Sequence, residues 1–142
     1  MKRAEYSTEL KLKHKLKSKK AMETKVYKGI VREGDYKENW DALFIGEGGQ
    51  PIAEIFEEDF EAKQITVRYW TSDEEKTKEE LQESVLRKLF GDVNARYSDA
   101  YSELTGYLWT DEELNVGGHD LLKEIRSYLG KYIYLEVDIH SA

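Results

Sequence analysis

The chain has 142 residues, a length typical of a single domain with one hydrophobic core. Hydrophobic residues make up 39% of it and charged residues 36%, and its many aromatic side chains argue against disorder. It contains no cysteine, which excludes disulfides and thiolate zinc sites. It has neither a run of about 18 apolar residues nor an apolar leader after the charged Lys2 and Arg3. We therefore expect a cytoplasmic protein.

The net charge of −7 is unevenly distributed along the chain. Residues 1–25 contain nine Lys or Arg and three acidic residues, a net charge of +6. The remaining residues contain 13 basic and 26 acidic side chains, a net charge of −13. We expect residues 1–20 to form a basic N-terminal arm and residues 21–142 to form a single acidic α+β domain. Such an asymmetry concerns partners rather than the fold: the arm favours phosphates or an acidic surface, and the domain favours a basic protein surface.

The basic arm alternates leucine with basic residues over residues 10–17. Alternation is typical of a β-strand, which would complete the sheet or pair with a second subunit. The like charges and the thin leucine stripe instead favour a solvated segment that binds a partner. We take this second interpretation as the prediction, in which the arm contacts RNA or DNA through its lysines, namely Lys11, Lys13, Lys15, Lys17, Lys19 and Lys20.

The segment between Met22 and Ser72 has a β pattern. Four strands are predicted there, namely Val26–Arg32, Trp40–Ile45, Ile52–Phe60 and Gln64–Trp70. Gly34 and Asp35 indicate a turn after the first strand, and residues 46–51 indicate a hairpin turn after the second. The sequence therefore predicts that this segment consists of strands alone.

Two helices are predicted in the rest of the domain. Residues 77–80 form a capping box, which predicts a helix that ends at Gly91. Gly117 and Gly118 lead into a second helix, which ends at Gly130. The apolar stripes of the two helices are expected to be Leu81, Val85, Leu86 and Leu89, and Leu121, Leu122, Ile125 and Leu129.

The remaining segments are predicted to be extended. Residues 95–109 read as extended chain with Gly106 as a bulge, and residues 132–140 alternate so regularly that they give the clearest strand. No internal repeat is evident in the sequence. The predicted fold is therefore α+β, with a mainly antiparallel sheet, two helices and the basic N-terminal arm.

No pattern of catalytic or metal-binding residues stands out. His14, His119 and His140 have no ligand spacing between them, and the sequence contains neither a phosphate-binding glycine loop nor a nucleophile elbow. Neighbouring acids at strand ends and loops lack the convergence that acid–base or two-metal catalysis needs. We therefore expect a protein that is not an enzyme and that binds no cofactor and no metal.

Three acidic runs are the leading candidates for contacts with a partner, because they offer phosphate-like charge to a basic protein surface. The predicted partner-binding acids of the domain are Glu57, Glu58, Asp59, Asp73, Glu74, Glu75, Asp111, Glu112 and Glu113. Most aromatic side chains are expected in the core. A smaller set is a candidate for stacking on a nucleobase, namely Arg96, Tyr97, Tyr107 and Trp109.

Three stretches in about the C-terminal third of the chain resemble small uncharacterised proteins of bacteriophages and prophages. They are residues 101–109 (YSELTGYLW), residues 115–122 (NVGGHDLL) and residues 130–137 (GKYIYLEV). Small acidic phage proteins are often inhibitors of host defence, such as anti-CRISPR proteins, or sponges for immune signalling nucleotides. The resemblance therefore implies an anti-defence protein in the cytoplasm of a bacterial host cell, and it assigns no catalytic residue.

The resemblance and the charge distribution together favour inhibition by occlusion. The acidic domain would dock on a basic nucleic-acid channel of a host defence protein or ribonucleoprotein complex, and the arm would reach guide RNA, DNA or an acidic patch. The alternative is an oligomeric sponge that sequesters an immune signalling nucleotide between aromatic and arginine side chains.

Overall fold

The computed structural model describes residues 23–37, 39–81 and 86–141. The strands are β2 (Glu23–Tyr36), β3 (Asn39–Ile45), β4 (Gln64–Ser72), β5 (Arg87–Ser102), β6 (Tyr107–Val116), β7 (His119–Asp120) and β8 (Tyr132–Ser141). The helices are α2 (Ile52–Phe60), α3 (Lys78–Leu81) and α4 (Leu121–Arg126).

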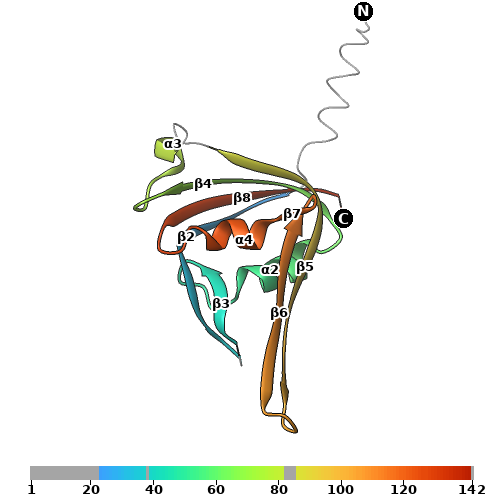
Figure 1. Cartoon of the computed structure of the whole chain (residues 1–142). Coiled ribbons are helices and arrows are strands. Elements are labelled where there is room, and N and C mark those ends of the chain that lie inside the picture. Colours follow the sequence, from blue (N-terminus) through green and yellow to red (C-terminus); the bar gives the residue numbers. More distant parts are fainter. Residues whose placement is uncertain (1–22, 38, 82–85, 142) are drawn as a thin grey trace, which may run out of the picture.

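The described strands form one seven-stranded sheet in the order β3-β2-β8-β4-β5-β6-β7, in which every neighbouring pair is antiparallel. The sheet curves around α2 and α4 on its inner side, while α3 lies on its outer side (Figure 1). The main core fills the space between the sheet and the two inner helices, and its buried residues run from Val31 to Ile139. The predicted α+β class with a mainly antiparallel sheet is confirmed, although the described residues form three short helices rather than two. None of these helices has the length and apolar character that crossing a membrane requires.

Residues 52–60 form helix α2 rather than the predicted strand. Ile52, Phe56 and Phe60 recur at every fourth residue and are all buried, so the helix presents them to the core as one stripe. Pro51 immediately precedes the helix, where no helical hydrogen bond needs its missing N–H. The turn predicted at residues 46–51 therefore joins a strand to a helix and is not a hairpin.

The helix predicted to run from the capping box to Gly91 is also wrong beyond its first turn. The box itself forms, since the Thr77 N–H donates to Glu80 Oε1 over 2.8 Å. Helix α3 nevertheless ends at Leu81, and Leu89 lies in strand β5, buried and paired with a residue of β4. Val85 lies outside the described residues. Residues four apart share a face in a helix and in a strand alike, so the apolar spacing did not separate the two.

Smaller predictions also need correction. Gly34 lies inside β2, and the chain turns instead near Lys37, which has a φ of +53°. Gly106 lies in the turn between β5 and β6 and not in a bulge. Leu86 and Leu129 are exposed rather than buried. The other predicted strands fall within β2, β3, β4 and β8, and the second predicted helix contains α4.

The order of the elements reveals an internal repeat that is not evident in the sequence. Strands β2 and β3, helix α2 and strand β4 are followed by strands β5 and β6, helix α4 and strand β8, so each half has the order β-β-α-β, with α3 and β7 as additions. The last strand of each half pairs with the first strand of the other half, and β4 pairs with β8 at the centre. Neither half can complete its sheet alone, so the two halves form one folding unit.

Two pairs of glycines occupy equivalent positions in the halves. Gly29 of β2 touches Gly46 after β3, and Gly91 of β5 touches Gly117 after β6. A Cβ atom on Gly29 or Gly91 would lie 2.4 Å from the Cα atom of its partner, and the φ angles of these two residues, +143° and +147°, are rarely adopted by L side chains. Just beyond these contacts, β2 changes its pairing from β8 to β3, and β5 changes from β4 to β6. The glycines allow each long strand to serve two partners in turn.

Helix α4 is fastened to the sheet through Glu124. The Tyr69 hydroxyl of β4 donates to Glu124 Oε1 over 2.7 Å, and Arg87 of β5 donates to both carboxylate oxygens, over 3.0 and 2.9 Å. The Arg87 guanidinium and, to a lesser degree, the Tyr69 hydroxyl hold the pKa of Glu124 below its usual value. Burial, reinforced by the bond to Glu124, raises the pKa of Tyr69.

We expect Gly91→Ala to lower the free energy of unfolding by about 2–4 kcal/mol, because the new Cβ would collide with backbone and adopt a strained φ. Gly48→Ala is the matched control, since a Cβ there meets nothing within 4 Å. Its effect should stay within about 0.5 kcal/mol. Urea unfolding of both variants measures the difference, and equal midpoints would contradict the role assigned to the contact between Gly91 and Gly117.

We expect the stability of the wild-type protein to fall as the pH drops below 4.5, the ordinary pKa of a glutamate side chain. A carboxyl whose pKa is depressed in the folded state stabilises that state above its unfolded pKa and loses this contribution as it is protonated. Glu124→Gln should be less stable at neutral pH and should lose less stability on acidification. Thermal unfolding between pH 7 and pH 3 tests this, and parallel curves for the two proteins would rule out Glu124 as a contributor.

Candidate functional site

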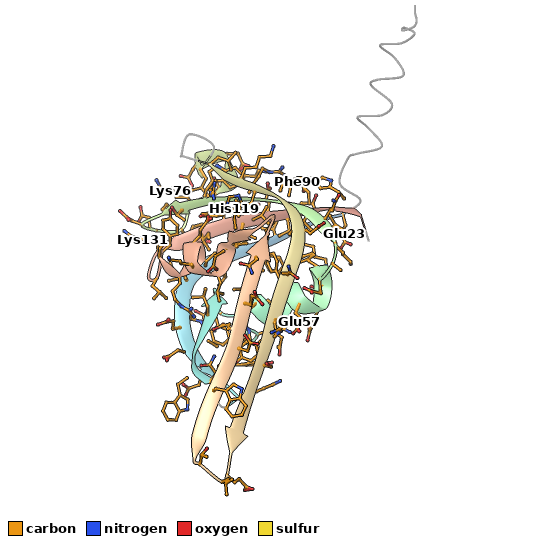
Figure 2. The ribbon with its side chains drawn as sticks, turned by 45° about the vertical axis from the view of Figure 1, so that its right-hand side comes forward. Glu23, Glu57, Lys76, Phe90, His119 and Lys131 are labelled. Atoms are coloured by element: carbon orange, nitrogen blue, oxygen red, sulfur yellow. The ribbon has the colours of Figure 1, made fainter. Side chains whose placement is uncertain are left out.

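The first predicted acidic run lies on α2, and Figure 2 shows Glu57 beside the long hairpin of β5 and β6. Once β5 has left β4, part of its edge has no neighbouring strand among the residues that the structure describes. Glu57 Oε1 accepts a hydrogen bond from the Tyr97 N–H over 3.3 Å, and Glu61 Oε1 accepts one from the Ala95 N–H over 2.7 Å. These two carboxylates therefore replace a missing strand partner of β5.

The other two members of this run are also engaged within the chain. Glu58 accepts a hydrogen bond from the Gln50 side chain over 2.8 Å, and Asp59 lies 3.6 Å from the ammonium of Lys25. A charge reversal of the whole run would therefore disturb contacts of the fold as well as any contact with a partner.

The second acidic run lies between β4 and α3. Asp73 pairs with Lys131, whose ammonium lowers the pKa of the Asp73 carboxyl. Glu74 accepts a hydrogen bond from the Ser72 hydroxyl through its backbone carbonyl. Glu75 lines a cavity of about 460 Å³ between α3 and the outer surface of β2 and β8. This cavity offers no net attraction to an anion, because its charged lining consists of three lysines and three glutamates: Lys28, Lys76 and Lys78, and Glu75, Glu79 and Glu80.

The third acidic run lies on β6, and its first and last members are on the outer face of the β5–β6 hairpin. Asp111 forms an ion pair with Arg96 at 2.7 Å, in which both side chains are about half exposed. Glu113 accepts a hydrogen bond from the Asn115 amide over 2.9 Å. The Asp111 carboxylate raises the pKa of Arg96. These contacts are on the surface and leave both carboxylates accessible.

Glu112, the middle member, points to the opposite face and links distant strands. Its Oε2 accepts a hydrogen bond from the Leu43 N–H of β3 over 3.1 Å, and its Oε1 lies 3.3 Å from Arg126 of α4. Arg126 also donates to Glu33 of β2 over 2.9 Å and to the backbone carbonyl of Asp41 over 3.2 Å. One carboxylate and one guanidinium thus join β2, β3, β6 and α4.

Two cavities meet at this junction. One, of about 440 Å³, lies between β3 and β6, and the other, of about 350 Å³, lies between β6 and α4. Both are lined by Glu112 and Arg126. We call the acidic residues that line them the acidic edge: Glu33, Asp41, Glu112, Glu113 and Asp120.

Sequence reasoning identified two of the five residues of the acidic edge, Glu112 and Glu113. It missed Glu33, Asp41 and Asp120 because each stands alone in the sequence and reaches the site only through sheet pairing and the placement of α4. The three predicted runs are not brought together, since they lie on α2, before α3 and on β6.

The predicted stacking set is divided between two faces. Tyr97 is buried on the inner face of the hairpin. Arg96 and Trp109 lie on the outer face, where Trp109 is 49% exposed. The side chain of Tyr107 lies outside the part of the chain that the structure describes. The set therefore does not form a single stacking platform.

Trp40 is an exposed aromatic side chain that sequence reasoning did not select. It is 73% exposed at the start of β3, between Asn39 and Asp41, both of which line the larger cavity of the acidic edge. Trp109 precedes Thr110, which lines the same cavity from β6. Each of the two strands thus carries one exposed tryptophan next in sequence to a residue that lines the cavity, and Trp109 lies on the face of β6 opposite Glu112.

The predicted lysine contacts of the arm lie outside the described residues. Within the described ranges, no group of three or more His, Asp or Glu side chains has the geometry to hold a metal ion. Comparisons of the chain with protein-family models, with curated proteins and with solved structures gave no match. The resemblance to phage proteins therefore stays a prediction.

We expect Glu112→Ala to lower the free energy of unfolding by about 1–3 kcal/mol, because the Leu43 N–H and Arg126 would both lose an acceptor. Its neighbour provides the control: Asp111→Ala removes a surface ion pair and should cost about 0.5 kcal/mol or less. Chemical denaturation separates the two variants. The bridging role of Glu112 is refuted if they are equally stable.

Proposed function

We propose that this chain is a binding protein that inhibits a bacterial defence complex by covering one of its basic, nucleic-acid-handling surfaces. The observation that carries the proposal is the acidic edge, together with the exposed Trp40 that stands between two residues of its cavity lining. The anti-defence context rests on the resemblance of the C-terminal segments to phage proteins. The contact itself rests on the charge and exposure of the described residues.

Exposed tryptophans beside a charged groove favour a protein partner. Tryptophan is among the residues that contribute most to protein interfaces, because its indole ring fills a pocket on the partner while the surrounding residues exclude water. Trp40, at 73% exposure, has its apolar surface in solvent, so burying it against a partner would gain hydrophobic free energy. The carboxylates around it would set the orientation and speed of the encounter.

The charge balance favours a basic partner over a nucleic acid. Many of the domain's cations are already neutralised by internal ion pairs, namely Lys25, Lys37, Arg68, Lys78, Arg87, Arg96, Arg126 and Lys131. With a net charge of −13 beyond residue 25, the domain repels phosphates and attracts lysine- and arginine-rich surfaces. A basic groove that binds guide RNA or DNA has the charge that the acidic edge complements.

The same observations favour binding over catalysis. Glu112 and Arg126 form a closed set of contacts with the backbone of β3 and with Glu33, and this arrangement positions strands rather than a reacting atom. Two observations give less support to the nucleotide-sponge alternative than to a protein partner. The predicted stacking residues lie on two different faces, and the cavity beside α3 is lined by equal numbers of lysines and glutamates.

The test is protection of phage in cells that carry a nucleic-acid-targeting defence system. We expect the wild-type chain to raise the efficiency of plating by at least tenfold against its target system. Trp40→Ala and Asp41→Lys should abolish that protection without lowering Tm, because both side chains are exposed. The control Glu47→Lys changes the same charge on an exposed residue outside the acidic edge.

Binding to the purified target complex gives the matching biophysical measurement. Loss of a central tryptophan should weaken Kd by about 30-fold or more, and raising the salt concentration should slow association of the wild type. The proposed surface is rejected if Trp40→Ala and Asp41→Lys protect as well as the wild type. The proposed function is rejected if the chain protects against none of the defence systems tested.

A further inference from the structure

Within the described part of the chain, the outer edge of β6 is open along most of its length. Residues 107–114 pair with β5 on one side, and among the described residues the only strand on the other side is β7, which reaches no further than Asn115 and Val116. Open strand edges present unpaired N–H and C=O groups, and proteins usually cover them. An edge of this length is a template for one added strand.

A groove follows this open edge. The two cavities of the acidic edge share Glu112 and Arg126 and extend from Thr110 of β6 to Asp120 of β7. Strand β6 lines one side of the groove, and β3 and helix α4 line the other, so an extended segment in it would meet a strand edge and a helix at once. Such a groove selects a segment by backbone pairing and by alternate side chains.

We propose that the occupant of this groove is the basic arm of the same chain, residues 10–17, added as a strand at the outer edge of β6. This inference goes beyond the proposed function and does not depend on it, because its occupant is part of the chain. Between the two interpretations of the arm given by the sequence, it selects the strand that completes the sheet.

The charges of arm and groove are complementary. The arm has lysine at every odd position of residues 10–17, with three leucines and His14 at the even positions, and residues 1–25 carry a net charge of +6. The groove is lined by the five carboxylates of the acidic edge against the cations Arg126 and Lys123. A strand places alternate side chains on opposite faces, so the odd-numbered lysines can face Asp41 and Glu112 while the leucines share the outer face with Trp109.

The pairing register of the sheet brings the start of the described chain close to the end of β6. Glu23 lies opposite Ile139, Ile139 opposite Ile65, and Ile65 opposite Gly91, which touches Gly117, the residue that follows β6. Three steps between neighbouring strands and one glycine contact span about 20 Å. The six peptide steps from Lys17 to Glu23 span about 20 Å when extended. The arm then runs parallel to β6, with its N-terminal end toward the tip of the hairpin.

The first measurement uses a labelled peptide with the sequence of residues 8–18. The peptide is titrated at low salt into the full chain and into a chain without residues 1–20, which keeps every buried core residue from Val31 to Ile139. We expect the truncated chain to bind the peptide at least tenfold more tightly than the full chain, whose groove its own arm already fills. Equal binding to both chains, or to neither, overturns the proposal.

Variants of the peptide and of the groove separate strand addition from bulk charge. A peptide of the same composition with its leucines and lysines in two blocks should bind at least tenfold more weakly, as should a peptide with Lys13→Pro, because proline removes a ladder donor. In the truncated chain, Asp41→Lys should weaken binding tenfold, whereas Glu47→Lys should not. Equal binding of the alternating and blocked peptides would overturn the strand arrangement.

Amide hydrogen exchange reads the same contact in the full chain without a peptide. Residues 108–114 should exchange more slowly in the full chain than in the truncated chain or in a full-length variant with Lys11, Lys13 and Lys15 changed to Glu. Unchanged exchange overturns the proposal, and so does a dimer of the full chain that is lost on truncation, because the arm would then belong to a second copy. No defence complex takes part in these measurements, so their outcome is separate from that of the plating test.

Discussion

Strands β2 and β5 each pair with one strand over their first half and with another over their second half, and this arrangement leaves backbone groups that other elements must satisfy. Once β5 has left β4 after Asp92, the edge that faced β4 still carries backbone groups that need partners, and a buried backbone group without one costs free energy. Glu57 of helix α2 and Glu61, which follows the helix, accept two of these N–H groups, and the carbonyl of Lys63 accepts from the Val93 N–H over 3.1 Å. Part of the acidic composition is therefore structural.

The α+β class could be predicted because the strands with the clearest alternation, above all β8, are central and pair on both sides. The errors in the predicted elements arose where the same spacing of apolar residues fits both a helix and a strand. The stripe of Ile52, Phe56 and Phe60 suits a helix, but the same side chains also satisfy a strand pattern, and only the position of α2 beneath β5 decides between them. The internal repeat could not be recognised from the sequence, because its two halves share a topology and a few equivalent positions, such as Gly29 and Gly91, but no continuous sequence similarity.

The candidate site was less predictable than the fold, for a related reason. A run of acids shows how much charge a segment carries but not where its side chains point, and in the run on β6 Glu112 faces the interior while its two neighbours face solvent. Isolated residues complete the site instead. Arg126 reaches the carbonyl of Asp41 across 85 positions of sequence, a contact that no local pattern encodes.

The two proposals meet at the acidic edge and together give it selectivity. A partner that enters the groove must displace the arm. The free energy of docking the arm therefore opposes binding, and the apparent affinity of the partner is lower than its affinity for the empty groove. A tethered segment competes at a high effective concentration, and a partner that offers only positive charge gains little over the lysines already present. Trp40 stands on β3, outside the edge of β6 that the arm would cover, and it remains open to a partner. A basic surface that also holds a pocket for the indole ring therefore gains a contact that the arm cannot match. This contact would let an acidic protein discriminate its partner from the many other basic surfaces in a cell.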